Sequence, residues 1–73
     1  MIIVRIKSTQ DITEFLHHLN QLGYETASHT TKIGYACDES GNPSKLRTAL
    51  KAAKDASKVT HIKFHSGSAV ITI

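Results

Sequence analysis

A short basic stretch, KLRTALKAAKDASK at residues 45–58, holds the first candidates for chemistry in this chain of 73 residues. Its cations recur at steps of three and four, which is helical spacing: Arg47, Lys51, Lys54 and Lys58. At about 100° per residue, they fall within an arc of about 60° on one helix. Such a cationic ridge can follow a phosphate backbone, so it is a candidate nucleic-acid-binding site. Lysine is also the ordinary residue of a solvated helical face, and this second interpretation is favoured.

The overall charge permits contact with nucleic acid without demanding it. Nine Lys and Arg against six Asp and Glu give a net charge of +3. The chain has only two tyrosines and two phenylalanines, and the apolar pattern predicts that Phe15 and Phe64 are buried. Without an aromatic pair on an exposed face, base stacking of the kind used by single-strand binders is not expected.

Five histidines are a high number for this length, so metal binding is the second candidate. His17 and His18 are neighbours on a predicted helix and diverge by about 100°, so they cannot bind one ion together. His61 and His65 lie four residues apart on a predicted strand, roughly 13 Å, which is too far for two imidazoles on one zinc ion. We therefore expect surface histidines and neither a metal nor another cofactor.

Nucleophilic and acid–base catalysis have no well-placed candidate. Asp38 and Glu39 follow Cys37 directly, and neighbouring carboxylates disfavour the reactive thiolate. We therefore interpret Cys37 as a small buried hydrophobic residue. The six carboxylates are scattered, with no local pair spaced for acid–base chemistry, and the glycine-containing turns lack the lysine of a phosphate-binding loop. The sequence predicts a protein that is not an enzyme.

Hydrophobic periodicity predicts the first two elements that position these residues. Residues 1–7 alternate as a half-buried strand does, with one face formed by Ile2, Val4 and Ile6. Apolar residues then recur at helical spacing: Ile12, Phe15, Leu16, Leu19 and Leu22. Ser8 is the expected cap of this helix, and Gly23 is the residue expected to close it.

The rest of the chain is predicted to form strands around a second helix. Segment 24–38 favours β-structure but has a weak pattern, so it forms either one bent strand or two strands joined by a turn. Asn42 and Pro43 are typical of a helix start. The apolar stripe that follows them consists of Leu46, Ala49, Leu50, Ala53 and Ala56. The last residues predict a β-hairpin about Gly67.

Two helices with one apolar stripe each, together with alternating strands, predict an α+β two-layer sandwich. Both helices cover one face of a four- or five-stranded, mainly antiparallel sheet. The element order is β-α-β-α-β-β or β-α-β-β-α-β-β. A chain this short forms one domain, residues 1–73, and buries only about 60 % of its unfolded surface. Self-association would add burial, so we expect a homo-oligomer at micromolar concentration.

The sheet face that the helices leave uncovered is the predicted interaction face. It is expected to carry Ile3, Arg5, His61, Lys63, His65 and Val70, with Lys7 among them. Small proteins without a site of their own most often act by occupying the surface of another molecule. We therefore predict a stand-alone protein-interaction module, a regulator or inhibitor with an unidentified protein partner. The alternative is a nucleic-acid-binding module that uses the cationic ridge.

Two further expectations concern location and pH. We expect a cytoplasmic protein without membrane contact, because no signal peptide and no bilayer-spanning apolar run is visible. The single Cys37 agrees, since one thiol cannot form an internal disulfide. His61 and His65 flank Lys63, so proton uptake by histidine between about pH 7 and 5.5 should weaken association through this face.

Overall fold

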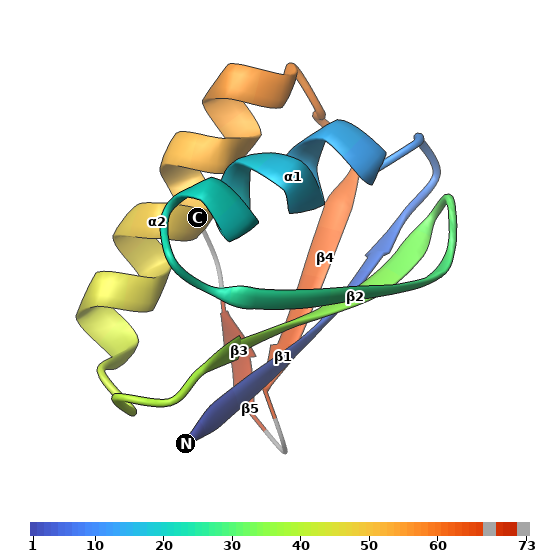
Figure 1. The fold of residues 1–73 in the computed structure, drawn as a ribbon. Helices are drawn as coiled ribbons and strands as arrows, with labels where there is room; N and C mark the ends of the chain where they lie inside the picture. Colours follow the sequence, from blue (N-terminus) through green and yellow to red (C-terminus); the bar gives the residue numbers. More distant parts are fainter. Residues whose placement is uncertain (67–68, 72–73) are drawn as a thin grey trace.

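The computed structural model describes residues 1–66 and 69–71, which form two layers (Figure 1). In chain order the elements are β1 (Ile2–Ser8), α1 (Thr13–Gln21), β2 (Glu25–Thr30), β3 (Ile33–Asp38), α2 (Pro43–Ser57), β4 (Ile62–Ser66) and β5 (Ala69–Ile71). This is the longer of the two predicted orders, because segment 24–38 forms two strands. Both helices pack on one face of the sheet, so the predicted α+β two-layer sandwich is confirmed.

In the described part of the chain, five strands form one sheet in the order β2-β3-β1-β4-β5, with every neighbouring pair antiparallel. β3 separates β1 from β2, which are joined through α1. In the same way, β1 separates β3 from β4, which are joined through α2. These are two interleaved split β-α-β units, the ferredoxin-like arrangement, with β5 added at one edge. β1 therefore lies in the centre of the sheet.

The hydrophobic core fills the space between the helices and the sheet. Phe15 of α1 meets Phe64 of β4 with ring centroids 5.8 Å apart. Val4 and Ile6 of β1 have no exposed surface, as the alternation predicts. The other buried apolar residues are Ile12, Leu16, Leu19, Tyr24, Ala36, Leu46, Ala49, Leu50, Ala53 and Val59. The predicted helix stripes are therefore correct except at their last members, Leu22 and Ala56, which are exposed because each stands at the end of its helix.

The predicted capping of α1 by Ser8 is wrong. Ser8 ends β1, where its hydroxyl donates a hydrogen bond to the carbonyl of His61 and accepts one from the N–H of Gln10, at 2.9 Å. The helix begins later, at Thr13, whose N–H donates to Asp11 Oδ1 at 2.8 Å. Because β1 extends through Ser8, the Ser8 hydroxyl links the end of β1 to the segment before β4 instead of capping the helix.

The predicted end of α1 at Gly23 is confirmed. Gly23 has a φ of +98°, in the left-handed region that glycine adopts without strain. Its N–H donates to the carbonyl of Asn20, and the N–H of Tyr24 donates to the carbonyl of Leu19. These two bonds form a Schellman motif, which turns the chain from α1 into β2.

The predicted start of α2 is confirmed as well. Asn42 Oδ1 accepts hydrogen bonds from the N–H groups of Ser44 and Lys45, at 3.1 and 3.2 Å. Pro43 occupies the first helical position, where a missing N–H has no cost. This cap satisfies two N–H groups at the start of α2.

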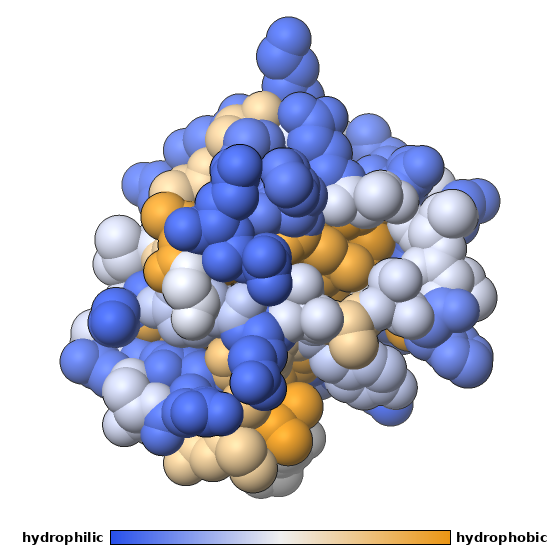
Figure 2. Space-filling view, in the orientation of Figure 1, coloured by the Kyte–Doolittle hydropathy of each residue, from blue (hydrophilic) through white to orange (hydrophobic). Residues whose placement is uncertain are grey.

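The surface is mostly polar. Figure 2 shows hydrophilic side chains over most of the side in view, with hydrophobic ones in separate patches. Among residues 1–66 and 69–71, no helix has the length and apolar character that a bilayer crossing requires.

Candidate functional site

The open face, which is the sheet face opposite the helices, carries a group of cations on β1 and β4. Arg5 and Lys7 of β1 are exposed, since they alternate with the buried residues of that strand. The register places His65 directly opposite Arg5 and Lys63 directly opposite Lys7. The structure thus brings together four of the residues that the sequence placed on this face.

The β3 side of the open face is apolar. Tyr35 pairs with Arg5, and Cys37 pairs with Ile3. Ile3 is 50 % exposed and Tyr35 is 41 % exposed, so both offer contact surface. Cys37 is half-buried on this face, so its predicted burial in the core is wrong. The physical reason is the alternation of β3, in which Ala36 takes the core-facing position.

The final strand, β5, lies at the edge of the sheet next to β4, and the structure describes only its backbone. β5 pairs with β4, and Val70 lies opposite His65. The side chain of Val70 and the predicted turn residue Gly67 lie outside the described part of the structure. The place of Val70 in the interaction face stays a prediction.

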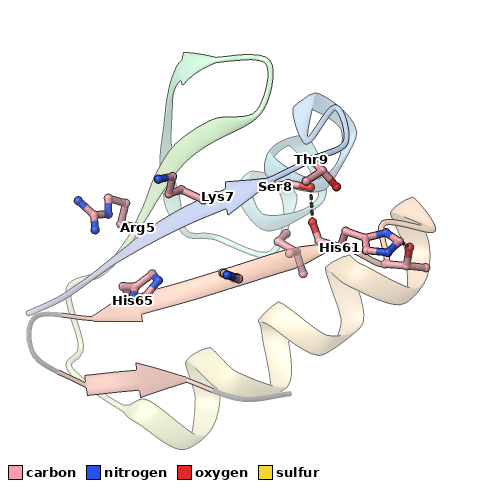
Figure 3. A pocket seen from close by; sticks show the side chains of 9 residues that line it. Arg5, Lys7, Ser8, Thr9, His61 and His65 are labelled. Carbon is pink, nitrogen blue, oxygen red and sulfur yellow. Dashed lines mark hydrogen bonds between the residues drawn. The ribbon is translucent and has the colours of Figure 1, made fainter.

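The open face is hollowed between β1 and β4, with a cavity of about 580 Å³. This hollow is lined by the cations Arg5, Lys7 and Lys63, the imidazoles of His61 and His65, the hydroxyl residues Ser8, Thr9 and Thr60, and Ile62. Figure 3 shows Arg5 and Lys7 on the same side of the sheet as His65. None of the six Asp and Glu side chains, all of which the structure describes, lines the hollow.

Gln10 holds one wall of the hollow in place. Its Oε1 accepts hydrogen bonds from the N–H groups of Thr60, at 2.8 Å, and His61, at 2.9 Å. The Thr60 hydroxyl donates to the same oxygen at 3.3 Å and lies 3.0 Å from Nδ1 of His61. Sequence reasoning missed Gln10, which lies fifty positions from Thr60 and carries no motif.

The hollow concentrates positive charge without compensation. Lys7 and Lys63 are directly opposite on neighbouring strands, an arrangement that destabilises a sheet. In the next pair along the strands, the guanidinium of Arg5 lies opposite the imidazole of His65. Within the described residues, the one contact closer than 4.0 Å between a basic and an acidic side chain joins His18 to Glu14, on α1. The hollow is therefore a surface that attracts anions.

The cationic ridge is a separate surface. Arg47, Lys51 and Lys58 are exposed and Lys54 is half-buried. Arg47 and Lys51 line a shallow depression of about 420 Å³ with two hydroxyl residues of α2. The buried side of α2 faces the sheet, so the ridge points away from it. The ridge and the hollow lie on opposite sides of the molecule and cannot form one site.

A smaller hollow, of about 340 Å³, lies near the start of α2. Asp38 Oδ1 accepts hydrogen bonds from the hydroxyl and the N–H of Ser40, at 2.6 and 2.9 Å, and the pKa of the Asp38 carboxyl is lowered by them. Burial, and then the charge of Asp38, raises the pKa of Tyr24. This group fixes the turn between β3 and α2.

Metal ligands do not gather in the described residues, where no group of three or more His, Cys, Asp or Glu is placed to hold an ion. His17 and His18 stand side by side on α1, with ring centroids 6.2 Å apart. His61 and His65 are the histidines that lie beside the cations of the hollow.

Comparisons with known proteins found no matching family model, no similar curated protein and no similar solved structure. A split β-α-β sheet also hosts many unrelated functions. The function is therefore argued from the open face and its hollow.

Proposed function

We propose that this protein is a binding module without enzymatic activity, and that its open sheet face binds an acidic protein partner. The observation that supports the proposal is the hollow, which gathers three cations and two histidines but none of the six Asp and Glu side chains, all of them described. Complementary charge of this kind speeds encounter and fixes the register of two proteins. The module acts as a regulator or inhibitor by covering the surface of its partner.

The apolar half of the face favours a protein partner. Ile3 and Tyr35 are exposed beside Arg5, and tyrosine and arginine are enriched among the residues that dominate interface energies. A partner would place acidic groups over the hollow and apolar groups over β3. The setting we propose is the cytoplasm, since the half-buried thiol of Cys37 suits a reducing compartment.

Affinity capture from nuclease-treated host lysate tests this proposal with matched variants. Arg5→Glu/Lys63→Glu reverses two charges on the open face, and Arg47→Glu/Lys51→Glu makes the same change in net charge on the ridge. We expect the face variant to lose the partners that the wild type retains, while the ridge variant keeps them. Loss in the ridge variant alone would contradict the proposal.

The acidic character of the partner sets the sign of the pH response. The sequence predicts that association through this face, with a partner or with a second copy, weakens as the pH falls, because protonated histidines add like charge. That sign holds where the two surfaces carry like charge, whereas for an acidic partner added positive charge on this face strengthens association. A fall in affinity between about pH 7 and 5.5 would indicate self-association or a cationic partner.

Nucleic acid bound on the ridge is the second candidate function. It is favoured by the exposure of Arg47 and Lys51 beside two hydroxyl residues in the depression on α2. If it holds, Lys51→Glu/Lys54→Glu weakens binding equally for all sequences. The wild-type affinity then falls with salt at a log–log slope near −0.9 for each phosphate neutralised on a duplex. Absence of saturable binding at about 150 mM salt would exclude this function.

A further inference from the structure

We propose that the hollow receives a phosphate monoester carried on a side chain of the protein partner. This inference rests on the protein-binding function proposed above and names the group that the open face recognises. It starts from an electrostatic cost in the free protein. Lys7 and Lys63 oppose each other in the register, and a guanidinium opposes an imidazole in the neighbouring pair. An anion bound above these two pairs, on the open face, would offset that repulsion.

The arrangement of these four residues suits one compact anion. Directly opposite side chains on antiparallel strands have Cβ atoms about 5 Å apart. Residues two apart on one strand are separated by about 7 Å. Arg5, Lys7, Lys63 and His65 therefore start from the corners of a rectangle of about 5 by 7 Å. From these positions their side chains are able to turn toward one tetrahedral anion above the centre of the rectangle.

The charge and the donors in the hollow favour phosphate over carboxylate. A phosphate monoester carries about −1.5 to −2 charges at neutral pH and has three strong acceptor oxygens. The hollow offers three permanent cations and, in addition, imidazole and hydroxyl donors. One carboxylate would leave most of this charge without a partner. The hydrogen bonds of Gln10 to Thr60 and His61 hold one wall ready before the anion arrives.

The distribution of charge over the rest of the face favours a protein over a nucleic acid. A polynucleotide repeats its phosphates along its whole length and needs cations along its whole track. Among the described strands, the cations of the open face lie on β1 and β4, while β3 presents Tyr35 and Cys37 beside Ile3 of β1. Glu25 of β2 pairs with Cys37 at the far edge and would repel a second phosphate. One anionic group followed by apolar contacts matches a phosphorylated segment of a protein.

The test is a titration of the ¹⁵N-labelled protein, followed by amide chemical shifts. The probes are a short alanine-based peptide with a central phosphoserine, the same peptide with serine, and the same peptide with glutamate. We expect saturable shifts at Lys7, Thr9, His61 and Lys63, and binding of the glutamate peptide weaker by about tenfold, the factor of one lost charge-assisted hydrogen bond. Lys63→Gln should abolish these shifts, and the control Lys51→Gln should keep them.

Three outcomes would overturn the inference. Equal affinity for the phosphoserine and glutamate peptides would remove phosphate as the recognised group, and the proposed binding of an acidic protein would stand. Equal affinity for inorganic phosphate and the phosphopeptide would assign the hollow to a free anion. Tighter binding of a thymidine oligonucleotide, with shifts over the same residues, would assign the face to single strands. Lys51 and Lys63 are both exposed, so we expect both variants to fold. A well-dispersed amide spectrum of each variant checks this.

Discussion

Replacing Lys63 with glutamate should stabilise the free protein while it abolishes binding of an anionic partner. Lys63 and Lys7 stand directly opposite each other on β4 and β1, and within the described residues no Asp or Glu lines the hollow around them. The wild type therefore carries a repulsive pair at the centre of its functional surface. Lys63→Glu converts this pair into an attractive one. Stability and function should move in opposite directions because the same charges serve both.

The size of the effect follows from the geometry. For two charges about 6 Å apart in water, Coulomb's law gives about 0.7 kcal/mol. Directly opposite charged pairs in sheets contribute about 0.2–1 kcal/mol, which agrees. Reversal removes a repulsion and adds an attraction, so the free energy of unfolding should rise by about 0.5–1.5 kcal/mol. Lys63→Gln removes only the repulsion and should give about half of that gain.

Urea unfolding followed by circular dichroism measures the effect in low and high salt. The gain should appear at about 0.01 M salt and vanish near 1 M, where the Debye length is about 3 Å. Lys51→Glu, on the exposed side of α2, makes the same change in net charge and should stay within about 0.5 kcal/mol. The reasoning is refuted if Lys63→Glu is less stable than the wild type at low salt, or if its gain does not depend on salt.

The remaining predictions concern packing, pH and assembly. Gly34→Ala should lower the free energy of unfolding by about 1–3 kcal/mol, measured in urea, because the added Cβ would lie 2.9 Å from the carbonyl oxygen of Ala27 and 2.8 Å from Leu16 Cδ1. Unchanged stability would show that the β2–β3 pair yields easily. Hydrogen bonds from Ser40 lower the pKa of Asp38 in the folded protein, so this contribution is present above the unfolded value of 3.8 and is lost as the pH falls below it. Asp38→Asn should therefore lessen the drop in urea midpoint between about pH 6 and 3, and an unchanged drop would contradict the assignment. Light scattering of the free protein at micromolar concentration should give at least twice the chain mass of 8.0 kDa, and a mass of 8.0 kDa would disprove self-association.

Local pattern predicts the elements of this fold well where periodicity is strong. The alternation of β1 and the stripes of both helices depend only on neighbouring residues, and so do the Asn42 cap and the Gly23 end. The failures lie where a distant contact decides. Ser8 looks like a helix cap, but a carbonyl fifty-three positions away takes its hydroxyl hydrogen. Cys37 looks like a core residue, but the helix-facing positions of β3 fall on Ala36 and its alternate neighbours.

The cations and histidines of the candidate site were predictable from the sequence, but their arrangement was not. Strand alternation alone places Arg5 and Lys7 on one side of β1. It likewise places Lys63 and His65 on one side of β4. The opposition of Lys7 and Lys63 depends on the register between strands more than fifty residues apart, which no local pattern encodes. The wall held by Gln10 depends on the same long-range pairing. The helix ridge, in contrast, is set by local helical spacing alone, although the sequence favours the open face as the interaction surface.

The most direct test of the central claim is a chemical-shift map of the labelled wild-type protein with poly-glutamate, a simple acidic polypeptide. The claim is that the open face, and not the ridge, is the surface that receives an anionic partner. We predict saturable shifts at Arg5, Lys7, Lys63 and His65, with the amides of 47–58 unchanged. Shifts confined to 47–58, or no saturable shift at either surface, would contradict the claim.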